Sequence, residues 1–210
     1  MSLTSPKGLF IAIEGGEGAG KTTLLQLLRP QLPPEREVVV VREPGATLLG
    51  EKLRQLLLHA DEKVACGAKA ELLLFLAARA QLIEEKIAPA LGRGAIVLAD
   101  RYNGSTIAYQ GGGRGLGLDY VQQLCESVCQ GVEPQLTLLL DIAPEEGLRR
   151  RCLASAAPDR FEAEALSFHQ RVREAFLALA ANPAAHWLAL DATEAPSLLA
   201  ARALGAISAL

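Results

Sequence analysis

The chain has 210 residues, with 21 Lys and Arg against 24 Asp and Glu, so its formal net charge is −3. Half of the residues are hydrophobic but only 4% are aromatic, so aliphatic side chains must build the core. This hydrophobic fraction excludes a disordered chain. The slightly acidic balance argues against a general nucleic-acid-binding protein, which would carry a basic patch. The length fits one domain that spans residues 1–210.

Short apolar runs alternate with longer helical patterns along the chain. The predicted strands are 9–14, 37–41, 95–99, 136–142 and 187–190, and the predicted helices are 20–32, 48–58, 69–92, 119–130, 144–153, 161–180 and 195–208. The strand centres, such as Val38–Val41 and Leu138–Leu140, are apolar at every position, which is typical of a parallel sheet covered by helices on both faces. We therefore predict a doubly wound α/β domain, with three layers around a five-stranded parallel sheet.

The ends of the chain and its cysteines indicate an intracellular protein. The stretch Met1–Gly8 is short and polar, unlike a targeting signal, and no run of about 18 uncharged apolar residues predicts a membrane span. The four cysteines are Cys66, Cys125, Cys129 and Cys152, without CxxC spacing. We expect buried free thiols, with a metal or redox pair as the alternative, and a cytoplasmic location.

The first predicted strand leads directly into Gly15–Thr22, which fits the pattern G-x-x-x-x-G-K-[ST] and opens the next helix. Such glycines let backbone N–H groups surround a phosphate, and the helix N-terminus adds partial positive charge. Lys21 is placed to reach the β- and γ-phosphates, and the Thr22 hydroxyl to bind Mg²⁺. A glycine-rich turn with a solvated lysine is the alternative. The predicted ATP-binding residues are Gly15, Gly16, Glu17, Gly18, Ala19, Gly20, Lys21, Thr22 and Thr23.

Arginines follow the second and third predicted strands, where ligands gather in α/β folds. Arg42 ends the second strand, Arg101 follows the third, and Arg54 lies on the helix between them. A phosphorylated acceptor and ATP repel each other by about 4 kcal/mol at about 4 Å in a medium of dielectric about 20, and guanidinium groups offset this repulsion. No Asn/Thr-Lys-x-Asp motif of a GTPase occurs. The pattern favours a small kinase; a nucleotide-dependent switch or assembly ATPase is the alternative from another class.

Phe75 and Arg79 lie four residues apart on the long predicted helix and share one face. Because the segment Leu72–Ala78 is apolar, we expect it to be largely buried, and a buried arginine needs an anionic or hydrogen-bonding partner. Phe75 alone is more typical of a core position. Together the two residues indicate a site that stacks on a flat base and hydrogen-bonds with it.

The full set of motifs resembles the bacterial thymidylate kinases. The segments that carry this resemblance, in the family's order between residue 9 and about 180, are the P-loop, Arg42–Thr47, Phe75-x-x-x-Arg79, Asp100–Tyr102 and Tyr109–Gly115. The P-loop alone is unspecific, whereas the combination is highly specific. One departure is Ala46, where the family's R-E-P-G-G-T segment has its second glycine. We expect this alanine to be tolerated if its φ is negative.

The resemblance implies that the protein moves the γ-phosphoryl group of ATP to dTMP, giving dTDP and ADP, with Mg²⁺ as cofactor. Its implied acceptor-phosphate ligands are Arg42, Arg54 and Arg101. Phe75 is implied to stack on thymine, Arg79 to bond its carbonyl edge and Thr106 to face the ring N–H. The other implied substrate residues are Tyr109 beside the sugar 2′ position, Glu17 at the 3′-hydroxyl, Ser105 and Gln110, and Asp100 is implied to help Thr22 hold Mg²⁺.

Several of these residues have structural alternatives. Ser105 and Thr106 are also the kind of residue that caps a helix. Glu17 fits an exposed loop carboxylate, Asp100 a structural strand end, and Gly111–Gly113 a flexible turn. Another nucleoside-monophosphate kinase is the alternative nearest to the proposed activity.

Arginines on either side of a small-residue loop suggest a mobile lid over about residues 149–163. Because the P-loop residue after Glu17 is Gly18, the resemblance implies that the catalytic arginine comes from the lid, and Arg151 and Arg160 are the favoured candidates. With Lys21 and Arg101 they complete the predicted catalytic set. Arg149 and Arg150 fit equally well a solvated helix end. The expected partners are ATP, dTMP and a second copy of the chain in a homodimer, without nucleic acid or membrane.

Overall fold

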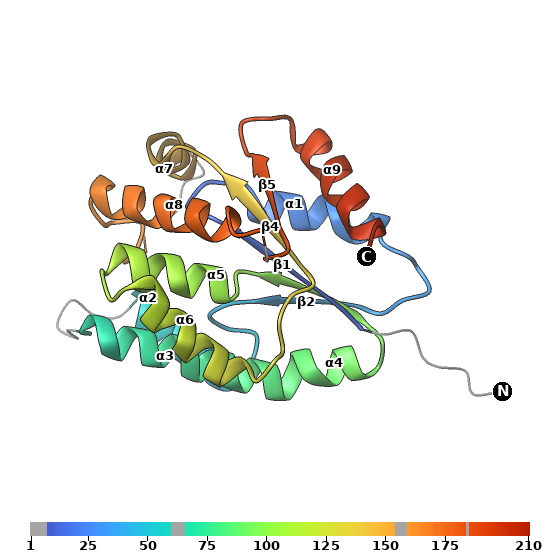
Figure 1. Cartoon of the computed structure of the whole chain (residues 1–210), viewed down its shortest axis with the longest axis horizontal. Coiled ribbons are helices and arrows are strands. Elements are labelled where there is room, and N and C mark those ends of the chain that lie inside the picture. Colours follow the sequence, from blue (N-terminus) through green and yellow to red (C-terminus); the bar gives the residue numbers. More distant parts are fainter. Residues whose placement is uncertain (1–7, 60–65, 154–158, 184) are drawn as a thin grey trace.

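A fully parallel five-stranded sheet forms the centre of the molecule (Figure 1). The computed structural model describes residues 8–59, 66–153, 159–183 and 185–210. The strands are β1 (Leu9–Gly15), β2 (Val38–Arg42), β3 (Ile96–Asp100), β4 (Leu136–Asp141) and β5 (Trp187–Asp191), in the order β2-β3-β1-β4-β5. β3 and β4 are buried at every position before their final aspartate, as expected of strands covered on both faces. The predicted strands are confirmed, with ends that differ by about one residue.

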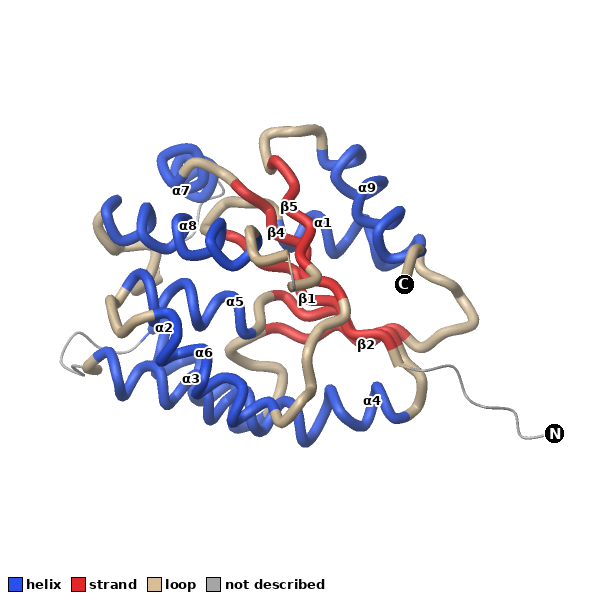
Figure 2. The backbone as a smooth tube through the Cα atoms, viewed as in Figure 1, coloured by secondary structure: helices blue, strands red, loops and turns tan. Residues whose placement is uncertain are grey.

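Helices cover both faces of the sheet, which confirms the three layers (Figure 2). They are α1 (Lys21–Leu28), α2 (Leu48–His59), α3 (Ala68–Leu82), α4 (Ala88–Gly92), α5 (Asn103–Thr106), α6 (Leu118–Cys129), α7 (Pro144–Leu153), α8 (Leu166–Ala180) and α9 (Pro196–Ser208). A 3₁₀ turn (Arg29–Gln31) follows α1, and π-helical segments follow α3 (Ile83–Ile87) and α5 (Ile107–Gly113). α1 and α9 pack on one face through leucine, isoleucine and alanine. α4 and α8 pack on the other.

The helical run from Asn103 to Gly113 was not predicted from the sequence, and the interpretation of Gly111–Gly113 as a flexible turn is wrong. These glycines let the π-helical segment approach α8 closely. A Cβ on Gly113 would lie 2.6 Å from the Phe168 ring, and one on Gly112 would lie 2.8 Å from the Ala175 methyl. Glycine disfavours helix in isolation, so this packing contact overrides the local preference.

Two expectations about burial need correction. The segment 72–78 is not buried throughout, because α3 is covered on one face only and Leu73 on the other face is 60% exposed. The thiols of Cys125 and Cys129 are buried and free as expected, but Cys66 is half-buried and Cys152 is exposed. A third difference is that the predicted helix 161–180 begins only at Leu166, after the extended residue Ala165.

The carboxyl ends of the three neighbouring strands β1, β2 and β3 meet at one edge of the sheet. Asp100 pairs in register with both Arg42 and Ile13, so the segments that follow these strands leave side by side. This edge is where parallel α/β folds bind ligands. Among the described residues, no helix is both long enough and apolar enough to cross a membrane.

Candidate active site

A cavity of about 420 Å³ opens at this edge of the sheet. It brings together most of the predicted site residues, from six separate segments of the chain. Those that line it are Glu17, Gly18, Ala19, Gly20, Lys21, Thr22, Thr23, Arg42, Arg54, Phe75, Arg79, Asp100, Arg101, Ser105, Thr106, Tyr109, Gln110 and Arg151. Three predicted residues do not line the cavity. Gly15 and Gly16 accept hydrogen bonds from Lys21 through their carbonyl oxygens, and Arg160 pairs with Glu71.

The P-loop has the backbone geometry that phosphate binding requires. Gly15, Gly18 and Gly20 have positive φ values of 142°, 66° and 91°, which favour glycine, and Gly20 leads directly into α1. The Lys21 ammonium donates hydrogen bonds to the carbonyl oxygens of Gly15 at 3.1 Å and Gly16 at 2.8 Å. Burial, together with the charge of Arg101, lowers the pKa of Lys21 to about 8. A bound phosphate would reverse this shift because it stabilises the charged lysine.

Arg101 follows β3 with a left-handed backbone conformation (φ 72°), which is uncommon for a residue other than glycine. The Arg101 N–H holds this turn by donating to Ile13 O at 3.0 Å. The guanidinium then points toward the P-loop, with 2.8 Å to a Glu17 oxygen and 3.0 Å to the carbonyl oxygen of Gly15. The strained turn therefore directs a fixed positive charge between the P-loop and the rest of the cavity.

Glu17 is not an exposed loop carboxylate, so that alternative is wrong: its side chain is only 15% exposed. Besides the ion pair with Arg101, it accepts a hydrogen bond from the Tyr109 hydroxyl at 2.6 Å. Burial alone would raise the pKa of Glu17, but the charges of Arg101 and Lys21 and the Tyr109 hydrogen bond lower it to about 2. Glu17 is thus an ionised acceptor that links the P-loop with Tyr109.

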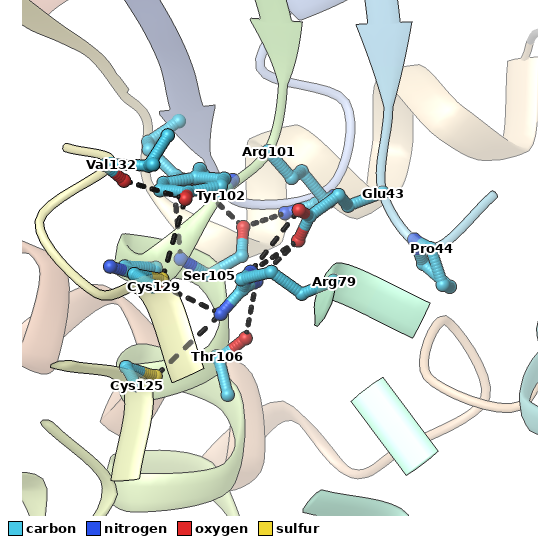
Figure 3. Close-up of polar contacts among 12 residues, drawn as sticks. Glu43, Pro44, Arg79, Arg101, Tyr102, Ser105, Thr106, Cys125, Cys129 and Val132 are labelled. Carbon is cyan, nitrogen blue, oxygen red and sulfur yellow. Dashed lines mark hydrogen bonds and ion pairs between the residues drawn. The ribbon is translucent and has the colours of Figure 1, made fainter. Parts of the chain in front are cut away.

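Arg79 lies in the wall of the cavity with only 1% of its surface exposed (Figure 3). Glu43 supplies the anionic partner that a buried arginine needs, 2.8 Å from the Arg79 Nε. The remaining Arg79 N–H groups donate to Asn103 Oδ1 and Thr106 Oγ1, both at 2.8 Å, and to the Cys125 thiol at 3.6 Å. Burial would lower the pKa of Arg79, but the Glu43 carboxylate raises it, so the guanidinium stays charged.

Glu14, at the end of β1, organises the start of α5. Its fully buried carboxylate accepts hydrogen bonds from the backbone N–H groups of Tyr102 at 2.9 Å and Ser105 at 3.0 Å, and another from the Ser105 hydroxyl. The capping group of α5 is therefore Glu14, and the interpretation of Ser105 and Thr106 as helix caps is wrong. Both residues sit within the helix, where their side chains face the cavity.

The segment after β2 forms the outer wall. Arg42 pairs with Glu51 across 3.3 Å, and Arg54 donates to the carbonyl oxygen of Pro44 at 2.9 Å. The backbone φ of Ala46 is 65°. We expected alanine to be tolerated here if φ were negative, and that condition is not met. A 2.8 Å hydrogen bond from the Ala46 N–H to Glu51 holds the residue in this conformation.

Three aromatic rings pack together in the wall of the cavity. Phe75 and Tyr109 each lie with their ring centroids 5.8 Å from that of Phe161, in edge-to-face geometry. Phe161 was not among the predicted site residues, although the arginine and small-residue pattern around it had indicated the lid. Phe75 is half-buried and lines the cavity.

The structure separates the two favoured lid arginines. Arg151 lines the cavity and pairs with Glu162, whereas Arg160 points to the buried carboxylate of Glu71 at 3.0 Å. Glu71 also pairs with Arg114 and accepts a hydrogen bond from Gln110 at 2.9 Å. The middle of the predicted lid, residues 154–158, lies outside the described residues, as do residues 1–7 of the N-terminal stretch.

The donor groups present fit an Mg²⁺ ion that arrives with a nucleotide. Thr22 and Asp100 both line the cavity next to Lys21, and the Asp100 charge acts on that lysine. In the described part of the chain, no three His, Cys, Asp or Glu side chains gather as a metal cage. A hydroxyl and one carboxylate suit Mg²⁺, which keeps several waters and takes its remaining ligands from phosphates.

A P-loop follows the central parallel strand, and arginines and aromatic rings line the same cavity. This arrangement defines a kinase for a small phosphorylated acceptor. The family comparison makes the class specific: the model of the thymidylate kinase family matches residues 13–202. The chain therefore belongs to the thymidylate kinase family and is a phosphotransferase.

Curated relatives that are named thymidylate kinases match this chain over nearly its full length. The thymidylate kinase of Protochlamydia amoebophila is 48% identical and covers 97% of this chain and 94% of its own. The thymidylate kinase of Synechococcus sp. strain JA-3-3Ab is 49% identical over 92% of both chains. That of Deinococcus radiodurans is 46% identical over 96% of this chain and 97% of its own.

Proposed function

We propose that this protein transfers the γ-phosphoryl group of ATP to dTMP, forming dTDP and ADP. The observation that carries the proposal is the shared cavity, whose lining includes the P-loop, the arginines Arg42, Arg54 and Arg101, and Phe75. The P-loop binds the donor, and the arginines bind the phosphate of the acceptor. Membership in the thymidylate kinase family supports dTMP as that acceptor.

Charge neutralisation and positioning carry the chemistry. The attacking group is an oxygen of the acceptor phosphate, which is already ionised near neutral pH, so no side chain needs to remove a proton. Lys21 neutralises the β- and γ-phosphates, and Arg101, fixed by the Gly15 carbonyl oxygen and the Glu17 carboxylate of the P-loop, holds the acceptor phosphate in line. Arg151, which lines the cavity from α7, adds positive charge as the phosphoryl group moves.

Thr22 and Asp100 would hold Mg²⁺ with the ATP phosphates, and the ion would neutralise charge on the β- and γ-oxygens. The protein contributes the Thr22 hydroxyl from the first turn of α1 and the Asp100 carboxylate from the end of β3. This assignment predicts a requirement for a divalent cation.

Base and sugar selection are assigned to the buried wall. Phe75 stacks on the thymine ring, and Thr106 faces the ring N–H with its hydroxyl oxygen already fixed by Arg79. Arg79 approaches the carbonyl edge while held by Glu43. Tyr109, locked by its hydrogen bond to Glu17, fills the space beside the 2′ carbon of the sugar and disfavours a ribose hydroxyl. Ser105 and Gln110 complete this wall.

A homodimer and a cytoplasmic location belong to the same proposal. Exposed leucines on α2 and α3 support a paired face: Leu48 is 88% exposed, Leu49 44% and Leu73 60%. The four free cysteines suit a reducing compartment. Sedimentation at several concentrations tests the dimer.

The acceptor preference tests the proposed activity. ADP release would be coupled to NADH oxidation, and kcat/KM compared for dTMP, dUMP, dCMP, AMP and GMP at saturating MgATP. We expect dTMP to give the highest value, with dUMP next because it lacks only the methyl group. A clear preference for dCMP, AMP or GMP would contradict the proposal.

A further inference from the structure

The P-loop and α7 touch each other through two glycines. Gly18 has a φ of 66°, and a Cβ built on it would lie 1.9 Å from the carbonyl oxygen of Gly147. A Cβ on Gly147 would in turn lie 2.2 Å from the carbonyl oxygen of Glu17. No real side chain tolerates such distances, so the two backbones are in direct contact at this point.

Gly147 lies inside α7, where glycine weakens a helix relative to alanine. The residue is buried, and its N–H makes an ordinary helical hydrogen bond to Ala143 O at 3.0 Å. Nothing in the local helix geometry requires glycine. The requirement comes from the P-loop, which occupies the place of a side chain.

α7 carries three consecutive arginines, which point in different directions. Gly147 and Arg151 are four residues apart, so they lie one turn apart on the same face of the helix. Arg149 is 62% exposed and pairs with Glu146. Arg150 points another way, donating to Ala192 O at 2.8 Å. Among these consecutive arginines, Arg151 is the one that lines the cavity.

We propose that the Gly18–Gly147 contact seats α7 on the P-loop and thereby aims Arg151 at the phosphate site, which makes Gly147 a positioning residue. The proposal rests on the proposed function, in which Arg151 acts on the transferred phosphoryl group. The same contact excludes position 18 as the source of this charge, since a side chain there would meet the Gly147 carbonyl.

The first test is Gly147→Ala, with Gly205→Ala as the matched control. Gly205 lies in α9 and a Cβ there has open space, so the control adds the same methyl group to a helix without a clash. We expect Gly147→Ala to lower kcat roughly 10- to 100-fold, as a displacement of about 1 Å can do, with the KM for dTMP unchanged. Gly205→Ala should keep the original kcat.

A double-mutant cycle separates positioning from a general loss of structure. Arg151→Ala should lower kcat about 100-fold or more in the unchanged protein. In the Gly147→Ala background, Arg151→Ala should lower kcat by a factor at least about ten times smaller, because the arginine has already been displaced. Fully additive effects of the two substitutions would overturn the proposal.

A third variant leaves both glycines in place and does not depend on whether Gly147→Ala folds. Exchanging two neighbours, Arg151→Cys with Cys152→Arg, moves the guanidinium about 100° around the helix onto an exposed position. We expect a loss of kcat as large as that of Arg151→Ala. Retained activity would refute the proposed alignment. Absence of dTMP-dependent ADP formation in the unchanged protein would instead contradict the proposed function.

Discussion

On the donor side of the cavity the binding groups are mostly backbone, whereas the acceptor side depends on side chains, among them Arg79, which the buried Glu43 carboxylate holds in place. The P-loop needs only positive-φ glycines, a helix N-terminus and Lys21. The acceptor side depends on pairs that join distant parts of the chain, such as Glu43 with Arg79. Damage to the donor side should therefore reduce catalysis with little loss of stability, and damage to the acceptor side should reduce both.

Loss of the Glu43 carboxylate should have the largest effect on stability. Glu43→Ala leaves the Arg79 charge buried without its anionic partner, and such changes cost about 3–5 kcal/mol. Urea unfolding followed by circular dichroism measures this change. Glu37→Ala, which breaks an exposed ion pair with Arg93 beside the same strand, is the control and should leave the midpoint nearly unchanged. Equal small shifts would show that Arg79 does not depend on Glu43.

Loss of the Lys21 ammonium should lower the catalytic rate without lowering the stability of the fold. Lys21→Ala removes charge from the phosphates as the phosphoryl group moves, and we expect kcat to fall more than about 100-fold. The free energy of unfolding should not fall, because the lysine is buried at a cost to its own charged state. Steady-state ADP release and urea unfolding of one preparation measure both quantities. Near-normal turnover would exclude a catalytic role for the lysine.

Loss of each of the two lid arginines should affect the rate to a different extent. Arg160→Ala should lower the rate with folding intact, but less than Arg151→Ala, because Arg160 contacts Glu71 rather than the cavity. Since Glu71 also holds Gln110, part of the effect should appear in the KM for dTMP. A larger loss of kcat for Arg160→Ala than for Arg151→Ala would reverse this assignment.

The pH dependence of ATP binding reports on the donor side alone. In the free protein Lys21 has a pKa of about 8, lowered mainly by burial, so it loses its proton as the pH rises through that value. Because ATP prefers the charged lysine, its affinity should be constant at lower pH and then fall by at most about tenfold per pH unit. Titration calorimetry between pH 6.5 and about 9.5 measures the profile. Lys21→Arg should abolish the inflection, and an unchanged profile would argue against this origin.

The smallest effect is expected at Ala46. A left-handed conformation costs an alanine about 1 kcal/mol more than a glycine, offset in part by the greater freedom of glycine when unfolded. Ala46→Gly should therefore raise the free energy of unfolding by up to about 1 kcal/mol, with the dTMP KM unchanged. A lower unfolding midpoint would show that the strain is absent.

The difference between the P-loop side and the side with long-range ion pairs also explains how much of the fold and of the site could be predicted from the sequence. The strands and the P-loop are encoded by short local patterns, so their positions were predicted within about a residue. Glu43 and Glu14 escaped prediction because their partners, Arg79 and Ser105, lie 36 and 91 residues away. The contact of Gly147 with the P-loop likewise has no local signal. Such pairs become visible only when the sheet order is known.

Transfer of labelled phosphate tests the central claim most directly. The protein would be mixed in excess with [γ-³²P]ATP and Mg²⁺, with and without dTMP, and the quenched products separated. We predict that the label appears in dTDP at the rate of ADP formation, and that almost none is released as phosphate when dTMP is absent. Release of labelled phosphate at the same rate with or without dTMP would identify an ATPase and contradict the account.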